Sequence, residues 1–479
     1  MRVTFASFLA IAACGSLLAG CPDRTISEVN PQQGRVEYKE IPVTLNRNVD
    51  ILFVIDDSVS MLDKQTNLKA NFDDFIDVLN TIQGGLPDVH IGVVSSDVGT
   101  KATQDGPAPA IGQIGNGGCS GNGKSGNLQL GQAVAGTDVM GNFISDIKQT
   151  DGTRLKNYTG TLPATFSKVA SLGAGGCGFE QHLQAMRRAL ENNPANANFY
   201  RQDAFLAVIF IADEDDCSMA KSAMLGPESP ALGPAQSFRC NRFGHTCAQG
   251  GRSETEMNQV GTKGQCGPNE SSQFLEKVGN YVEFLKKLKS DPNKVIVAGI
   301  MGTTEPYQVE LRMPPGGGSP QPSVAHSCSY TGMAGVENAD PPTRIKFFLD
   351  QFPNRSTFTS ICQQNLSGGL QLIAQLLKTA IGDPCIEGKL ADVDPETAGV
   401  QYDCSVSDVT NARKPNQSEK ILPACKEGSP GMYTNMPCWR IATDMANCMK
   451  APHHVLKIER AEAPPPETIV FANCVTEAI

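Results

Sequence analysis

The chain has 479 residues, with 40 Lys and Arg against 50 Asp and Glu, which gives a formal net charge of −10 at pH 7. This acidic balance argues against nucleic acid as a partner, because affinity for nucleic acid comes mainly from cationic side chains that neutralise phosphates. Sixteen cysteines indicate an oxidising compartment, where disulfides persist.

Residues 1–20 are predicted to be an export signal. Arg2 precedes an apolar stretch that runs to Ala13, and small residues precede Cys21, which is typical of a cleaved signal and not of a membrane span. The Leu-Ala-Gly-Cys run that ends at Cys21 resembles the lipobox of bacterial lipoproteins. This resemblance implies acyl chains such as palmitate on Cys21 and a lipid anchor in the outer membrane of a Gram-negative cell, on its periplasmic face or at the cell surface. The alternative is ordinary secretion, with Cys21 as one more disulfide partner.

The remaining cysteines are expected to form disulfides. Without Cys14 in the signal and Cys21 at the anchor, 14 of the 16 remain, an even number. We expect Cys177 to pair with Cys217, because both follow elements that end at the same edge of the predicted sheet. A zinc knuckle is not expected, since no Cys-x-x-Cys pair occurs and the spacing of Cys240 and Cys247 does not fit one.

Four segments are expected along the chain. After the signal, residues 21–46 are polar and without periodicity, which indicates a lipidated tether. Residues 47–382 alternate strands and helices, which predicts a doubly wound, mostly parallel α/β sheet. Residues 383–479 are rich in cysteine and predict a small β-type module, in which strands at 454–460 and 468–474 pair with each other.

Elements within 47–382 are predicted from hydrophobic periodicity. Strands are expected at 49–55, 90–95, 204–212 and 294–300, with an extended piece at 357–361, and helices at 63–82, 179–191, 272–289, 342–350 and 366–381. Three long excursions at 98–160, 214–270 and 302–340 are rich in Gly, Pro, Asn or Cys, so we expect insertions there and no further elements of the sheet.

Two acidic loops follow two of the predicted buried strands. The loop after strand 49–55 contains Asp56, Ser58 and Ser60, and the loop after strand 204–212 contains Asp213 within an Asp-Glu-Asp-Asp run. In a parallel sheet such loops meet at the carboxyl edge, where ligands bind. Carboxylate and hydroxyl oxygens suit hard cations, so the sequence predicts a site for Mg²⁺, or for Mn²⁺ or Ca²⁺.

The first of these loops resembles the Asp-x-Ser-x-Ser signature of von Willebrand factor type A (VWA) domains, and the resemblance covers about residues 47–382. Together with the lipobox, it is similar to a subgroup of Gram-negative bacterial lipoproteins that carry this domain. The resemblance implies a metal-ion-dependent adhesion site (MIDAS) formed by Asp56, Ser58, Ser60 and Asp213, with one coordination place left for an acidic side chain of a partner protein.

The segment from Gly175 to Gln181 stands where the family has its middle loop, and this middle loop departs from the family pattern. Cys177 stands where the family has a metal-binding threonine, and a half-cystine is not an oxygen ligand. Glu180 is a further candidate ligand, and a water could also fill the place. Asp97 leaves strand 90–95 at the same edge and is expected to support a metal ligand by a hydrogen bond from outside.

The sequence therefore predicts a membrane-anchored lipoprotein that binds a protein or envelope ligand with an acidic group through a metal ion, and not an enzyme. One alternative is a structural envelope scaffold with a vestigial metal site. A metal-dependent hydrolase is less favoured, because no general base is evident, and His182 on a predicted helix suits a surface or packing role. Residues 118–125 match the phosphate-binding pattern Gly-x4-Gly-Lys-Ser, but flanking glycines leave it without the required strand and helix, so ATP is not an expected ligand.

Overall fold

The computed structural model describes residues 35–477 except 43–45, 83–84, 315–316, 333–334, 383, 387, 393, 395, 398–399, 413, 446–447, 449–450, 463 and 466–467. The predicted signal, the predicted lipid site at Cys21 and most of the predicted tether lie outside the described residues. Within the described part, no helix combines the length and the apolar character that a membrane crossing requires.

Seven strands form the central sheet in the order β16-β11-β8-β2-β3-β6-β7. The first five run parallel, β6 pairs antiparallel with β3, and β7 pairs antiparallel with β6. All residues of β8 and β11 are buried, as expected for continuous apolar strands covered on both faces. The strands are β2 (Asn48–Ile55), β3 (Asp88–Ser95), β6 (Ile144–Lys148), β7 (Arg154–Lys156), β8 (Phe205–Ile211), β11 (Val295–Met301) and β16 (Ser356–Ser360).

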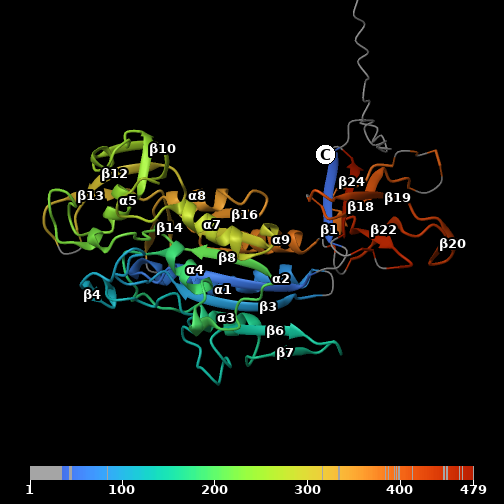
Figure 1. Cartoon of the computed structure of the whole chain (residues 1–479), viewed down its shortest axis with the longest axis horizontal. Helices are drawn as coiled ribbons and strands as arrows, with labels where there is room; N and C mark the ends of the chain where they lie inside the picture. Colours follow the sequence, from blue (N-terminus) through green and yellow to red (C-terminus); the bar gives the residue numbers. More distant parts are fainter. Residues whose placement is uncertain are drawn as a thin grey trace, which may run out of the picture.

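Helices cover both faces of this sheet (Figure 1). Phe53 belongs to one apolar core and Leu52 to the other, because successive side chains of a strand point to opposite faces. The first core includes α1 (Leu62–Ala70), α2 (Phe72–Asn80), α3 (Leu162–Val169) and α9 (Ser367–Ile381), and the second includes α4 (His182–Leu190), α7 (Val278–Leu288) and α8 (Thr343–Asp350). A mixed α/β chain with a large sheet of mainly parallel strands is therefore confirmed.

The single helix expected over 63–82 is wrong, because α1 and α2 are separated at Asn71. The backbone of Asn71 has φ −115° and ψ 8°, outside the helical range. Its side-chain amide donates to the carbonyl of Asn67 at 2.7 Å, and its backbone N–H donates to Leu68 at 3.3 Å. A side chain that bonds back to the preceding turn competes with helix continuation and explains the break.

The first excursion was expected to add nothing to the sheet, and this is wrong for β6 and β7. Their apolar signal is weak because β6 carries Asp146 at a buried position. Arg154 Nε and Tyr158 Oη each donate to the Asp146 carboxylate at 2.5 Å, so the buried charge is satisfied. The same excursion holds the hairpin β4 (Ile111–Ile114) and β5 (Asn116–Cys119).

The second and third excursions share a four-stranded sheet in the order β13-β12-β10-β9. In Figure 1 this sheet lies at the opposite end of the molecule from the C-terminal strands. The excursions contain α5 (Phe238–Gly244), β9 (His245–Gln249), α6 (Glu254–Met257), β10 (Gly261–Pro268), β12 (Tyr307–Arg312), β13 (Gln321–Val324), and the hairpin β14 (Cys328–Thr331) and β15 (Val336–Ala339).

The C-terminal module is built of β-strands and includes a strand from the expected tether. Strand β1 (Arg35–Pro42) pairs with β24 (Thr468–Thr476), so the expectation of a tether is wrong for these residues. The expected pairing of 454–460 with 468–474 is also wrong. Strand β24 is central and takes β1 and β18 (Cys404–Thr410) as partners for its two edges, whereas β23 (His454–Glu459) lies between β17 (Cys385–Ile386) and β22 (Cys438–Thr443).

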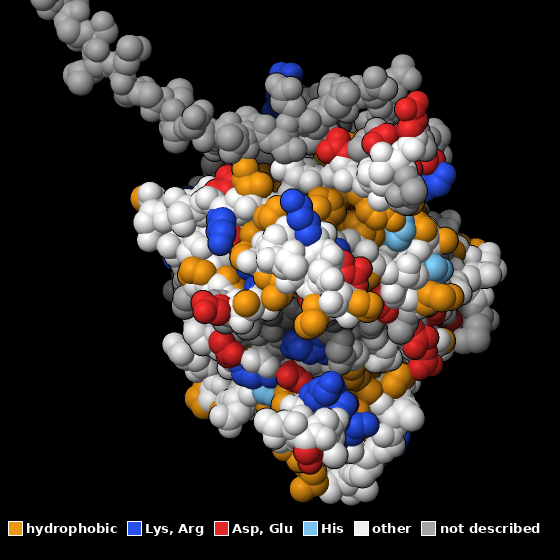
Figure 2. Space-filling model, turned by 90° about the vertical axis from the view of Figure 1, so that its right-hand side faces the viewer, with side chains coloured by type: hydrophobic (Ala, Val, Ile, Leu, Met, Phe, Trp, Pro, Cys, Tyr) orange, Lys and Arg blue, Asp and Glu red, His pale blue; other side chains and the backbone are white. Residues whose placement is uncertain are grey.

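Strand β19 (Ser418–Leu422) completes the sheet of β24, and β20 (Glu427–Ser429) pairs with β21 (Met432–Tyr433). Figure 2 views the molecule from the end that carries this module. Apolar side chains there are interspersed with both basic and acidic ones, so no single charge dominates that end.

Disulfides use all 14 cysteines that were expected to form them. The expected pair of Cys177 with Cys217 is wrong, although both belong to one apolar cluster. Cys177 pairs with Cys119 because β5 runs beside the middle loop, and Cys217 pairs with Cys240 on α5. The other pairs are Cys247–Cys266, Cys328–Cys362, Cys385–Cys448, Cys404–Cys474 and Cys425–Cys438.

Candidate metal centre

The two acidic loops meet at the carboxyl edge of the central sheet. Strands β2 and β8 are parallel neighbours, with Ile55 beside Ile211 at their ends. The backbone N–H of Asp56 donates to the carbonyl of Ile211 at 2.9 Å, which joins the start of one loop to the end of the other strand. Asp56 and Asp213 therefore leave adjacent strands at one edge, the place where open α/β sheets bind ligands.

The first loop presents one free carboxylate oxygen and two hydroxyls. Asp56 is fully buried, and its Oδ1 accepts the N–H of Ser58 at 2.7 Å. Asp56 Oδ2 has no hydrogen-bond partner among the described residues. The hydroxyl oxygens of Ser58 and Ser60 lie 3.1 Å apart, and the loop is exposed at Val59 and Ser60. The loop is therefore accessible to solvent at Val59 and Ser60, whereas the carboxylate of Asp56 is buried.

Asp213 contributes a second buried oxygen without a partner. Its side chain is 2% exposed, and its Oδ2 lies 3.0 Å from the ammonium of Lys64. The other oxygen, Oδ1, has no partner within the described part of the chain. The Asp213 carboxylate is thus held on one side and left free on the other.

Glu180 and Glu214 enlarge this acidic cluster. Glu180 is 2% exposed and its Oε1 has no partner among the residues described. Desolvation, and then the neighbouring charges of Glu214 and Asp56, raise the pKa of Glu180 well above its usual value. Desolvation and the charges of Asp340 and Asp213 raise the pKa of Glu214 to about 8. Desolvation and Asp213 likewise raise the pKa of Asp56.

A small oxygen-binding cation fits these residues. Burial and neighbouring carboxylates disfavour the ionised forms of Asp56, Glu180 and Glu214, and a divalent cation would stabilise those forms. No group of three or more His, Cys, Asp or Glu side chains is arranged around one metal position in the described ranges. The hydroxyls of Ser58 and Ser60 would therefore have to complete the ligand set with Asp56 and Asp213.

The middle loop docks on the first loop but offers no hydroxyl there. The N–H of Gly176 donates to the carbonyl of Asp57 at 2.8 Å. A Cβ at Gly176 would lie 2.2 Å from Asp57 Oδ1, so only glycine permits this approach. The next residue, Cys177, is bonded to Cys119.

Asp57 and Asp97 make contacts with residues other than the candidate metal ligands. Asp57 is fully buried, accepts from the hydroxyl of Ser95 at 2.6 Å and forms an ion pair with Lys124. Lys124, the lysine of the segment that matches the phosphate-binding pattern, is therefore a counterion for Asp57. Asp97 Oδ1 accepts the N–H of Gly99 at 2.8 Å, and its charge interacts with Asp57 and Lys124.

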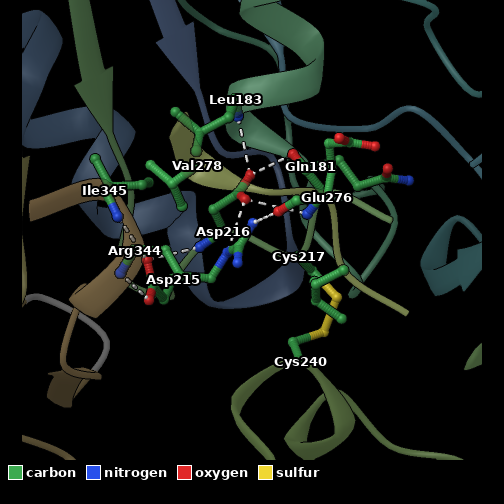
Figure 3. Close-up of polar contacts among 12 residues, drawn as sticks. Gln181, Leu183, Asp215, Asp216, Cys217, Cys240, Glu276, Val278, Arg344 and Ile345 are labelled. Carbon is green, nitrogen blue, oxygen red and sulfur yellow. Dashed lines mark hydrogen bonds and ion pairs between the residues drawn. A yellow bond between two sulfur atoms is a disulfide. The ribbon is translucent and has the colours of Figure 1, made fainter. Parts of the chain in front are cut away.

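The last two residues of the Asp-Glu-Asp-Asp run are structural (Figure 3). Asp215 accepts from His245 Nε2 at 2.8 Å and from the N–H of Arg344 at 2.7 Å. Burial opposes ionisation of Asp215, but the hydrogen bond and charge of His245 outweigh it and lower its pKa. Asp216 accepts from the N–H of Leu183 at 2.9 Å and from Arg344 Nε at 3.2 Å. Both carboxylates thus fix the loop that carries Asp213.

Two side chains beside this centre were not assigned to it from the sequence: Lys64, and His182, which was expected to have a surface or packing role. His182 is fully buried, and neither ring nitrogen has a partner within the described residues. Its Nε2 lies 4.0 Å from Asp56 Oδ2, and burial lowers its pKa, which favours the neutral ring. Lys64 lies four positions after Ser60, and residues at this spacing on a helix lie on the same face. Its position beside the first loop could therefore have been predicted.

Comparisons with known proteins add little to this geometry. No protein-family model matches the sequence, and no curated protein matches it. Among solved structures, the conserved hypothetical protein BatB from Bacteroides thetaiotaomicron aligns with 69% of this chain and 98% of its own, at 11% identity and a TM-score of 0.24. The pilus adhesin RrgA from Streptococcus pneumoniae aligns with 93% of this chain and 58% of its own, at 12% identity and a TM-score of 0.22. Similarity at this level establishes neither family nor function.

A hydroxyl introduced at position 177 is expected to strengthen the binding of Mg²⁺. The double substitution Cys119→Ser with Cys177→Thr removes the disulfide and adds a hard oxygen donor directly after Gly176, whose N–H donates to the carbonyl of Asp57. Calorimetric titration with Mg²⁺ should show tighter binding than Cys119→Ala with Cys177→Ala, which also lacks the disulfide. Both variants should lose about 4 kcal/mol of stability from the lost cross-link. Equal affinities in the two variants would show that position 177 does not reach the metal.

Proposed function

We propose that the described residues from β2 to α9 form a doubly wound domain of the VWA type. When the edge strand β7 is left out and the other six strands are numbered along the chain, β6-β3-β2-β8-β11-β16 gives the order 3-2-1-4-5-6, in which the reversal falls between β2 and β8. The helices on the two faces support the same proposal. The candidate centre lies at this reversal, where such sheets bind their ligands.

We infer that the function is metal-dependent binding of a protein or envelope ligand. The observation that carries this inference is a pair of buried oxygens without a partner among the described residues, Asp56 Oδ2 and Asp213 Oδ1, beside the hydroxyls of Ser58 and Ser60. Mg²⁺, or Mn²⁺ or Ca²⁺, would be held by these groups and, when bound, would attract an acidic group of the partner. Exposure at Val59 and Ser60 gives such a partner access to the loop.

A lipid anchor is part of this proposal. Lipid on Cys21 would place the protein at the outer membrane. The described chain enters at β1 in the C-terminal module, whereas the sheet formed by the second and third excursions lies at the other end of the molecule (Figure 1). An anchored chain would therefore present the second and third excursions, and the centre beside them, away from the membrane.

The alternative function is a structural envelope scaffold with a vestigial metal site. Two observations favour the scaffold. Cys177 forms a disulfide, and the ammonium of Lys64 already neutralises part of the negative charge of Asp213. A metal-dependent hydrolase has less support. The cavity beside Glu180 and Glu214 has a volume of about 70 Å³, whereas pockets for small-molecule ligands usually have roughly 300–1,000 Å³.

Binding to isolated cell envelopes tests this proposal. The oxidised chain from residue 22 to 479 should be retained on envelopes in Mg²⁺ or Mn²⁺ and released by a chelator. Asp213→Asn should reduce retention at least tenfold, which corresponds to about 1.4 kcal/mol. Asp350→Asn on α8, whose partner Lys346 is on the same helix, serves as the control. Retention that neither the chelator nor Asp213→Asn changes would favour the scaffold.

A further inference from the structure

A fully buried lysine stands at the edge of the candidate centre. Lys64 on α1 is 1% exposed, and its Nζ contacts three oxygens. These are Asp213 Oδ2 at 3.0 Å, Glu337 Oε2 at 2.9 Å and the carbonyl of Ser60 at 2.9 Å. An ammonium has three N–H donors, so each contact accounts for one of them.

These contacts fix both the charge and the place of the ammonium. A buried ammonium is costly unless it is paired and hydrogen-bonded. Burial opposes protonation of Lys64, but Asp213 and Glu337 outweigh that effect and raise its pKa. The bond to the Ser60 carbonyl holds the ammonium against the loop that carries the candidate metal-binding hydroxyls.

Glu337 reaches Lys64 from the third excursion. It lies on β15, and the β14–β15 hairpin is docked on α1 by Tyr330 Oη, which donates to Asp63 Oδ2 at 2.7 Å. The disulfide between Cys328 and Cys362 attaches the same hairpin to the segment after β16. The excursion therefore completes the surroundings of Lys64.

We propose that Lys64 is a positioning residue of the candidate centre. By holding Oδ2 of Asp213 it fixes the rotation of that carboxylate, so that Oδ1, which has no partner among the described residues, is the oxygen offered to the cation. Glu337 keeps Lys64 in place through a second ion pair. This inference rests on the proposed function. A lysine that only substituted for the metal would have the opposite effect on affinity.

Titration calorimetry with Mn²⁺ tests the sign of this effect on the oxidised chain from 22 to 479. Lys64→Met is expected to weaken Mn²⁺ binding about 10–100-fold, the range for groups that orient metal ligands. Lys64→Arg should restore a large part of the affinity, because it keeps a donor for Asp213. Glu337→Gln should weaken binding in the same direction. Lys287→Met, at an exposed position of α7, should leave binding unchanged.

Each outcome decides between distinct alternatives. Unchanged or tighter binding by folded Lys64→Met, or no recovery in Lys64→Arg, overturns the positioning role while leaving the metal site itself intact. If the near-ultraviolet dichroism of Lys64→Met shows that it does not fold, Glu337→Gln decides: weaker binding supports the role, and unchanged or tighter binding overturns it. No binding by the parent chain rejects the proposed function instead.

Discussion

Asp56→Asn and Asp213→Asn are each expected to abolish divalent-metal binding by the oxidised chain. Each substitution replaces a carboxylate that has a buried oxygen without a partner among the described residues, at the edge of the sheet where the two acidic loops meet. A direct ligand should matter more than a supporting group, so the loss of affinity should exceed about 100-fold. Calorimetric titration of Mg²⁺, Mn²⁺ and Ca²⁺ into the parent and both variants measures this effect.

Asp151→Asn provides a matched control for this prediction, because Asp151 is exposed in the turn between β6 and β7. It should bind metal like the parent. Dichroism spectra should show that all three variants are folded. The prediction is contradicted if the parent binds no metal, or if Asp56→Asn and Asp213→Asn bind as tightly as the control.

The metal affinity measured in these titrations should increase with pH. Desolvation and neighbouring carboxylates raise the pKa of Glu214 to about 8 and also raise the pKa of Asp56 and Glu180. A bound cation must displace the protons that these groups retain. Affinity should therefore increase from about pH 5 to pH 8, with proton release that is measurable in buffers of different ionisation enthalpy.

The stability of the metal-free chain should show the opposite trend. A carboxyl whose pKa is higher in the folded chain favours the folded state below the unfolded value, about 4.3 for Glu, and this contribution is lost as pH rises through the folded value. For Glu214 the window therefore extends up to about pH 8. Added metal should raise the unfolding temperature more at the upper end of this window than at its lower end.

The central sheet could be predicted because its strands are continuous apolar runs, and the structure places β2, β3, β8 and β11 within a few residues of the predicted bounds. Strand β6 was missed because its buried Asp146 is satisfied by Arg154 and Tyr158, and such pairing is not visible in a periodicity. The break at Asn71 depends on one side chain that bonds to the preceding turn.

Only those parts of the candidate centre that follow from short sequence patterns could be predicted. Asp56, Ser58, Ser60 and Asp213 follow buried strands, so their common edge follows from the sheet. Lys64 contacts Glu337, which lies 273 positions away in the third excursion. No short sequence pattern indicates the path of that excursion. Likewise, β1 was not predicted because the alternation of its short segment has meaning only beside β24.

Arg344→Met is expected to destabilise the folded chain far more than the loss of a surface ion pair. Arg344 is fully buried, with Nε 3.2 Å from Asp216 Oδ2 and Nη2 2.7 Å from the carbonyl of Glu276. Removing the cation leaves the buried Asp216 carboxylate without its charged partner. Breaking a buried pair in this way costs about 3–5 kcal/mol. Urea denaturation of the oxidised chain measures the change in the free energy of unfolding.

Two further variants separate this charge effect from a loss of packing. Lys287→Met removes an ion pair with Glu283 on the surface of α7, where such pairs contribute about 0.3–0.5 kcal/mol. The double variant Arg344→Met with Asp216→Asn should be more stable than Arg344→Met alone, because it removes the charge that was left unpaired. If the double variant is the less stable of the two, Arg344 acts through packing.

The effect of Arg344 should also reach the candidate centre. Arg344 contacts Asp215 through its backbone and Asp216 through its side chain, and these residues follow Asp213 within three positions. Under conditions where Arg344→Met remains folded, its metal affinity should therefore fall although Arg344 offers no oxygen to a cation. An affinity equal to that of the parent would mean that β8 and Lys64 alone suffice to place Asp213.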